Sequence, residues 1–70
     1  MSEIIQSKEE LRSYLQAKEA IGADRVEVVV AESVLEASPE IARKYNYSIV
    51  DGEDLPNGYV KLYLVYRKLK

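Results

Sequence analysis

The absence of cysteine and histidine from a chain of only 70 residues is the feature that most constrains how this chain can fold. A chain this short buries only about 60% of the surface that its unfolded form exposes, so its core is marginal. Small domains often add disulfides or a structural metal ion, but this sequence lacks the side chains that commonly provide either. Close packing or self-association must therefore supply the stability, and we expect one domain over residues 1–70.

The same absences restrict the chemistry that the chain can perform. It has no thiol nucleophile and no imidazole for acid–base catalysis. We find no nucleophile paired with a base, and three scattered glycines cannot form a phosphate-binding loop. The sequence therefore predicts that the protein is not an enzyme and that it holds no metal ion and no cofactor.

Composition indicates a folded chain, since 47% of the residues are hydrophobic and 31% are charged. No apolar run approaches the roughly 20 residues that are needed to cross a bilayer. Residues 1–10 are acidic and lack the basic and long apolar regions of a signal peptide. We therefore expect a cytoplasmic protein that does not contact a membrane.

The first third of the chain predicts a short strand followed by a helix. Two adjacent isoleucines indicate a brief, weak strand within residues 2–6. Ser7 and Glu10 have the spacing of a capping box, which predicts a helix over residues 8–20. Gly22 provides a natural stop for that helix.

Residues 26–31 predict a strand because they are rich in β-branched side chains. Val26, Val28 and Val30 share one face of such a strand by its two-residue period. Val29 lies on the other face, which is therefore not cleanly polar.

The next segment carries two helix starts in succession. Ser33 and Glu36 fit a capping box, which predicts a helical turn over residues 34–37. Ser38-Pro39 predicts a second start, with proline at the first position of a helix over residues 39–45.

The last third predicts two strands, over residues 47–50 and 59–69. Between them, Asp51-Gly52 and Pro56-Asn57-Gly58 are both turn signals. The predicted order is therefore β-α-β-α-β-β, an α+β two-layer sandwich with two helices on one face of a four-stranded mixed sheet. The opposite face of the sheet is left uncovered.

From Ala23 onward, three pieces of the sequence carry a family resemblance. They are Val26-Glu27-Val28, the segment Ser38-Pro39-Glu40-Ile41-Ala42-Arg43-Lys44-Tyr45-Asn46-Tyr47, and the final Arg67-Lys68. The chain here resembles the SirA/TusA-like family, whose pattern Ile-Pro-x-Trp-Ala-Lys-Lys-x-Gly-His is matched by Pro39, Ala42 and Lys44. The resemblance covers about two-thirds of the chain and implies the βαβαββ sandwich.

The chain departs from that family where the family's chemistry resides. SirA/TusA-like proteins carry Cys-Pro-x-Pro at the start of the first helix, and the cysteine holds a persulfide. Here the region reads Gln6-Ser7-Lys8-Glu9, so sulfur transfer is excluded. Ser7 is no substitute, because an alcohol without a neighbouring base is a poor nucleophile, and we interpret it as a helix cap.

The uncovered face of the sheet is the candidate interaction surface. Apolar area beside tyrosines on so small a protein usually marks association, and tyrosine is enriched at interfaces. We therefore predict a non-enzymatic protein-interaction or regulatory module that forms a homodimer or binds a protein partner. The predicted interaction face consists of Val29, Tyr59, Lys61, Tyr63, Val65 and Arg67.

The alternative is a weak single-stranded RNA- or DNA-binding module on the same face. Rings of Tyr59 and Tyr63 would stack on bases, while Lys61 and Arg67 would meet phosphates. The net charge of −2 makes nucleic-acid binding the weaker of the two predictions, because nucleic-acid binders usually carry a net positive charge.

Overall fold

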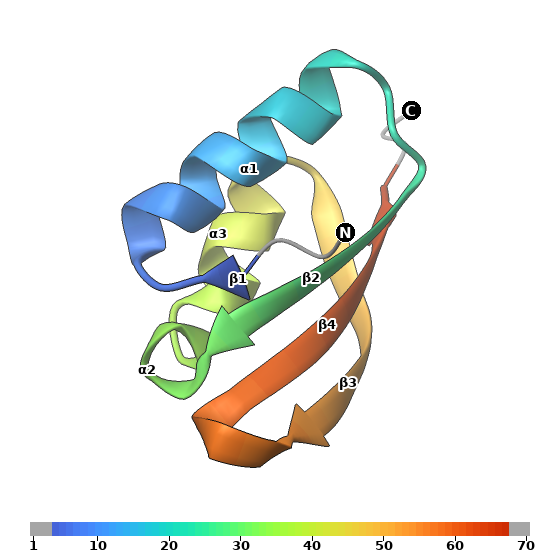
Figure 1. The fold of residues 1–70 in the computed structure, drawn as a ribbon. Coiled ribbons are helices and arrows are strands. Elements are labelled where there is room, and N and C mark those ends of the chain that lie inside the picture. Colours follow the sequence, from blue (N-terminus) through green and yellow to red (C-terminus); the bar gives the residue numbers. More distant parts are fainter. Residues whose placement is uncertain (1–3, 68–70) are drawn as a thin grey trace.

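The computed structural model describes residues 4–67, in which helices cover one side of a twisted sheet (Figure 1). The predicted α+β class and element order are confirmed, and the first strand is as short as expected. In chain order the elements are β1 (Ile4–Ile5), α1 (Lys8–Ala20), β2 (Arg25–Ala31), α2 (Glu32–Leu35), α3 (Ser38–Lys44), β3 (Tyr47–Leu55), the 3-10 turn η1 (Pro56–Gly58) and β4 (Tyr59–Tyr66).

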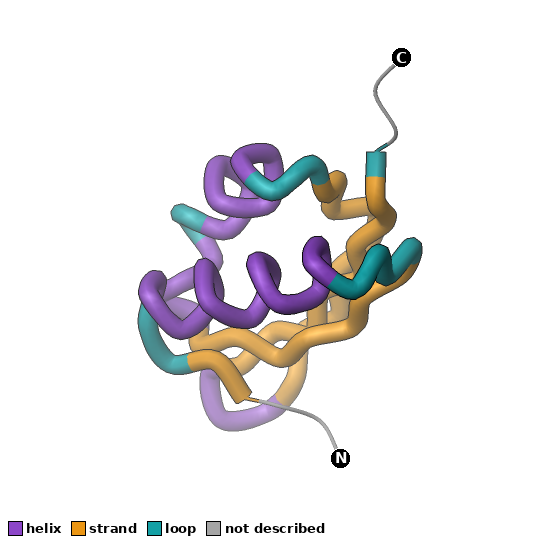
Figure 2. Tube along the Cα trace, turned by 90° about the horizontal axis from the view of Figure 1, so that it is seen from above, coloured by secondary structure: helices purple, strands orange, loops and turns teal. Residues whose placement is uncertain are grey.

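The four strands lie in the order β1-β2-β4-β3. β1 runs parallel to β2, whereas β4 is antiparallel to both of its neighbours. Across the central pair, Val28 lies opposite Leu62 and both are buried. Alternate residues of β2 and β4 therefore point into the helical layer, which Figure 2 shows lying across the sheet.

The core lies between the helices and this face of the sheet. α1 contributes Leu11 and Leu15, which are buried one turn apart, and α3 contributes Ile41 and Ala42. Each large apolar side chain that is fully buried contributes roughly 1.5–3 kcal/mol. The strands complete the core with Ile5, Val26, Val28, Val30, Tyr47, Val60, Leu62 and Leu64, and α2 adds Val34.

Tyr47 closes the core at the end of β3 and is only 1% exposed. Its ring meets the edge of the Tyr66 ring at a centroid distance of 5.3 Å. Its hydroxyl donates a hydrogen bond of 2.9 Å to the backbone oxygen of Ala23. Burial raises the pKa of Tyr47 above its usual value, and the negative charge of Glu19 raises it further.

The predicted start and stop of the first helix are confirmed. The Ser7 hydroxyl accepts a hydrogen bond of 3.2 Å from the backbone N–H of Glu10, as an N-cap does. The Glu10 carboxylate in turn accepts from the N–H of Gln6 at 2.7 Å, one residue earlier than in a standard capping box. Gly22 follows the helix with a φ of 70°, a conformation that glycine adopts without steric cost.

The predicted caps of the two short helices are wrong. α2 begins at Glu32 and has no side-chain cap, so Ser33 and Glu36 do not form a capping box. Ser38 lies inside α3 and is buried, and its hydroxyl donates to the backbone oxygen of Val34 at 3.0 Å. A buried hydroxyl needs a partner, and the carbonyl four residues back in the preceding turn provides one.

The predicted turn at Asp51-Gly52 is also wrong. β3 continues through these residues to Leu55 and pairs with β4 over its whole length, apart from a bulge between Ile49 and Asp51. The chain reverses only at η1, where Asn57 and Gly58 have φ values of 68° and 81°. The ladder to β4 therefore overrides the local turn preference of Asp-Gly. β4 itself ends at Tyr66, and residues 68–69 of the predicted strand lie outside the described residues.

Candidate functional site: the open face of the sheet

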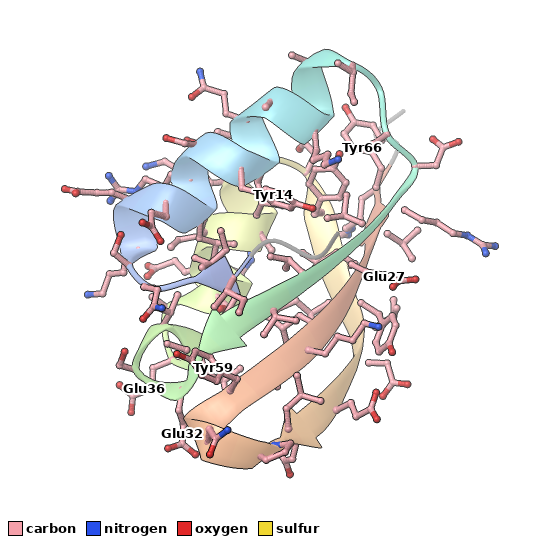
Figure 3. All side chains as sticks on the ribbon, viewed as in Figure 1. Tyr14, Glu27, Glu32, Glu36, Tyr59 and Tyr66 are labelled. Atoms are coloured by element: carbon pink, nitrogen blue, oxygen red, sulfur yellow. The ribbon has the colours of Figure 1, made fainter. Side chains whose placement is uncertain are left out.

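Five of the six residues of the predicted interaction face lie on one side of the sheet. Pairing places Val29 opposite Lys61, Glu27 opposite Tyr63, and Ala31 opposite Tyr59. Figure 3 shows Glu27 projecting from β2 on the side away from α1. We call this surface the open face. Its described residues are Ile4, Arg25, Glu27, Val29, Ala31, Ser48, Val50, Asp51, Glu53, Leu55, Tyr59, Lys61, Tyr63 and Val65.

A chain of polar contacts crosses three strands of the open face. The Lys61 ammonium lies 3.4 Å from the Glu27 carboxylate on β2 and 5.4 Å from the centre of the Tyr63 ring. The Tyr63 hydroxyl donates to the Glu53 carboxylate on β3 at 3.3 Å. The hydrogen bond to Glu27 raises the pKa of Lys61 above its usual value. The cation and the ring are therefore already engaged by carboxylates of the same chain.

Apolar side chains on this face are unusually exposed. Val50 is 61% exposed and Val65 is 36% exposed. They line a shallow depression of about 400 Å3 together with Tyr63, Arg25 and Glu27. The bulge accounts for Val50, because an extra residue in one strand is left unpaired and re-aimed.

Val29 and Tyr59 contribute less to this surface than the sequence suggested. Val29 belongs to the open face but is only 8% exposed, so it forms part of the floor. Tyr59 is half-buried at the start of β4, where its hydroxyl accepts a hydrogen bond of 3.5 Å from the Gln6 side chain. Within the depression, Val50 and Val65 are therefore the most accessible apolar side chains.

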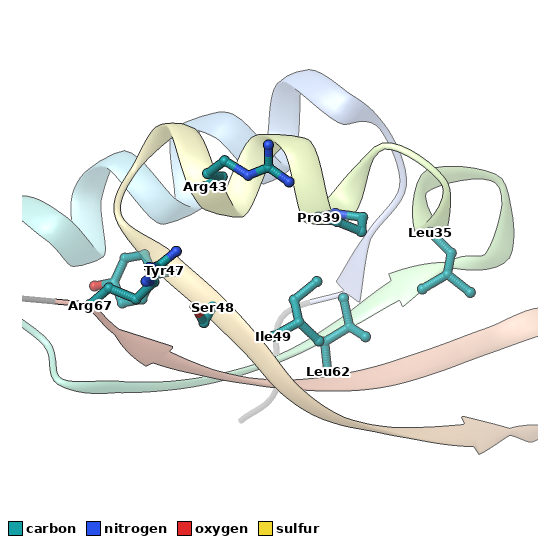
Figure 4. A pocket seen from close by; sticks show the side chains of 8 residues that line it. All are labelled: Leu35, Pro39, Arg43, Tyr47, Ser48, Ile49, Leu62 and Arg67. Carbon is teal, nitrogen blue, oxygen red and sulfur yellow. The ribbon is translucent and has the colours of Figure 1, made fainter.

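Arg67 does not join the other predicted residues. It follows the last residue of β4, and its backbone N–H donates to the Asn46 oxygen at 2.6 Å. Its side chain lines a separate groove together with Arg43 of α3 (Figure 4). The alternation of β4 ends one residue too early to hold Arg67 on the open face.

Sequence reasoning missed the contribution of β3 to this face. Val50, Asp51 and Glu53 were assigned to the end of a strand and to a loop, yet all three lie on the open face. The Pro56-Asn57-Gly58 turn signal is sufficient to reverse the chain. If it is the turn and Asp51-Gly52 is not, residues 51–55 can pair with β4. Residues 51–55 are mostly polar, so their sequence did not indicate a strand.

Comparison with protein-family models, curated proteins and solved structures found no match to this chain. Within residues 4–67, no group of three or more acidic, cysteine or histidine side chains is arranged to hold a metal ion. No helix in the same part of the chain is long and apolar enough to span a membrane. The chemistry of the open face is therefore the main guide to function.

Proposed function

We propose that this protein is a non-enzymatic interaction module that associates through the open face, with a second copy of itself as the partner. The observation that carries the proposal is the exposure of Val50 and Val65 beside Tyr63, on a sheet face that α1, α2 and α3 leave uncovered. Apolar side chains bordered by polar groups are typical of association surfaces. Tyrosine adds a large ring with a polar end, as interfaces favour.

The charges of the open face suit pairing with an identical surface. In the part of the chain that the structure describes, Arg25 makes no ion pair, while Asp51 and Glu53 on the neighbouring strand carry negative charge. A two-fold axis brings one patch against an identical one. It can therefore set Arg25 of each copy against the acidic side chains of the other.

An interface of standard size would cover a modest share of the protein surface. A standard interface buries about 800 Å2 on each partner. The accessible surface of this chain is 4996 Å2, so such an interface takes roughly a sixth of it. Association also offsets the marginal core that 70 residues provide.

The element order supports a module of the SirA/TusA-like type without sulfur chemistry. The helices and the mixed sheet follow the βαβαββ order that the resemblance implies. The position of the family's persulfide cysteine falls in the segment where Ser7 caps α1. In this proposal the site of the family's chemistry serves only to start the helix.

Single-stranded nucleic acid is the second candidate partner, because Tyr59, Lys61 and Tyr63 share one face. Among the described residues, however, the face carries three carboxylates against two cations. Glu27 also engages Lys61. Phosphate-driven binding falls steeply as salt rises, so a labelled oligonucleotide titrated at low and physiological salt tests this candidate.

Sedimentation equilibrium on two matched variants tests the proposed interface. Val50→Glu places a charge in the exposed apolar patch and should weaken self-association at least about tenfold, because a desolvated unpaired charge costs several kcal/mol. Ile21→Glu is the control, since Ile21 is 73% exposed at the end of α1, away from the open face. Circular dichroism should show both variants folded.

Two outcomes would refute the interface. One is a molar mass of the unmodified chain that stays at the monomer value up to millimolar concentration. The other is an equal loss of association in both variants, which would mean that charge in general, rather than the open face, controls it.

A further inference from the structure

A groove of about 490 Å3 opens between α3 and β3, on the side of the sheet that the helices cover. Its volume is within the range of small-molecule sites. Figure 4 shows that its two ends differ in chemistry: Arg43 and Arg67 lie toward one end, whereas Leu35, Ile49 and Leu62 lie toward the other. Among the residues that the structure describes, no acidic side chain lines it.

The cationic end brings together two guanidinium groups from distant parts of the chain. Arg43 comes from the last turn of α3, and Arg67 follows β4, held by its backbone hydrogen bond to Asn46. Within residues 4–67, neither arginine is ion-paired to a carboxylate. This differs from the open face, where Glu27 engages Lys61 at 3.4 Å.

Two guanidinium groups without ion-pair partners around one groove create a positive electrostatic potential, which attracts an anion. Guanidinium is also suited to bidentate contact with carboxylate, sulfonate or phosphate oxygens. The cationic end therefore has the chemistry to hold an anionic head group.

The apolar end offers a surface for a hydrophobic body. Leu62 is buried in the core, while Leu35 and Ile49 are half-buried and pack against it. All three line the groove. Covering this surface with an apolar group removes it from water.

We infer that this groove binds a small amphipathic organic anion, with its head group on Arg43 and Arg67 and its apolar body on Leu35, Ile49 and Leu62. An inorganic anion satisfies only the cationic end, and a neutral hydrophobe satisfies only the apolar end. The two ends together specify a ligand that carries both. The site is separate from the open face and does not depend on the function proposed for that face.

Fluorescence titration with two probes that share one apolar body tests the inference. 8-Anilinonaphthalene-1-sulfonate carries the anionic group, and N-phenyl-1-naphthylamine lacks it. We expect saturable binding of the sulfonate at one site per chain and at least about tenfold weaker binding of it to Arg43→Gln and to Arg67→Gln, since hydrogen bonds to charged groups contribute about 1.5–3 kcal/mol. Binding of the neutral probe should not change in these variants.

Arg12→Gln is the matched control, because Arg12 is exposed on α1 and lies in neither the groove nor the open face. It should bind the sulfonate as tightly as the unmodified chain. Excess inorganic phosphate at constant ionic strength should compete only weakly. Unchanged binding in both groove variants, or equal weakening in Arg12→Gln, would overturn the site, and so would phosphate binding as tight as that of the sulfonate.

Discussion

The two faces of this sheet come from the same alternating strands, yet they meet different surroundings. On the covered face, β2 and β4 present valine and leucine side chains that are at most 6% exposed. On the open face, the same strands present charged residues, tyrosines and valines, of which Val65 is 36% exposed. Alternation therefore separates two sets of side chains, and only the set under the helices is packed into the core.

Polar groups show the same difference. Under the helices, the hydroxyls of Ser38 and Tyr47 each donate to a backbone oxygen. Among the described residues, no buried side-chain polar atom lacks a hydrogen bond. On the open face, the polar contacts among Glu27, Lys61 and Tyr63 lie at the surface, where water competes with them. The covered face thus supports the fold, while the side chains of the open face stay in contact with solvent.

The largest expected effect comes from removing a core side chain of the covered face. Leu15 is fully buried, so Leu15→Ala should lower the free energy of unfolding by about 2–5 kcal/mol. Val65→Ala, on the open face, should lower it by less than about 1 kcal/mol. Urea denaturation at a low protein concentration measures both. Equal losses would break the comparison between the faces.

Tyr47→Phe tests whether the buried hydroxyl supports the covered face. It removes the hydrogen bond to Ala23 and should cost about 1–3 kcal/mol, because a carbonyl loses its partner. Since burial raises the pKa of Tyr47 in the fold above the unfolded value of 10.0, its contribution is complete below that value. It is lost as the pH rises through the folded pKa.

Urea denaturation between pH 8 and pH 11 measures this linkage. The variant should lose less stability on the alkaline side than the unmodified chain does. A steeper alkaline loss in Tyr47→Phe would contradict the account.

A smaller effect is expected at the start of the helical layer. Ser7→Ala removes the acceptor for the Glu10 N–H and should cost about 1 kcal/mol. Ser13→Ala is the control, because Ser13 is exposed within the same helix and alanine has the higher helix propensity there. Thermal melting followed by circular dichroism should lower the midpoint for Ser7→Ala alone.

The smallest effect on stability should come from the polar network of the open face. Glu27→Gln removes the charge that faces Lys61, and exposed ion pairs contribute little because water and salt screen them. The denaturation midpoint should stay within error at moderate salt. The Lys61 pKa should fall, because the hydrogen bond to Glu27 is the main cause of its rise. NMR titration of the lysine side chains measures the shift, and an unchanged pKa would contradict the geometry.

Much of the fold could be predicted from short-range patterns. The helix over residues 8–20 and the strands around residues 25–31 and 59–66 carry clear periodicity and caps, and they lie where they were expected. The errors arose where tertiary contacts override local preference. Ser38 is buried and donates to Val34 instead of capping, and Asp51-Gly52 extends β3 because β4 provides a ladder for it.

The candidate site was less predictable for the same reason. Alternation alone assigned Val29, Lys61, Tyr63 and Val65 to one face, which the pairing confirms. It could not place Val50, because a bulge changes the direction of one residue without a clear sequence signal. Alternation also misplaced Arg67. β4 ends at Tyr66, so the alternation of the strand no longer determines where the Arg67 side chain lies.

The most direct test of the central claim is a dilution series of 1H–15N correlation spectra of the unmodified chain, from millimolar to micromolar concentration. If the open face pairs with a second copy, the backbone signals of Val50, Tyr63 and Val65 should move with concentration, and those of the exposed residues of α1 should stay fixed. Shifts confined to α1, or none at any residue, would contradict the account.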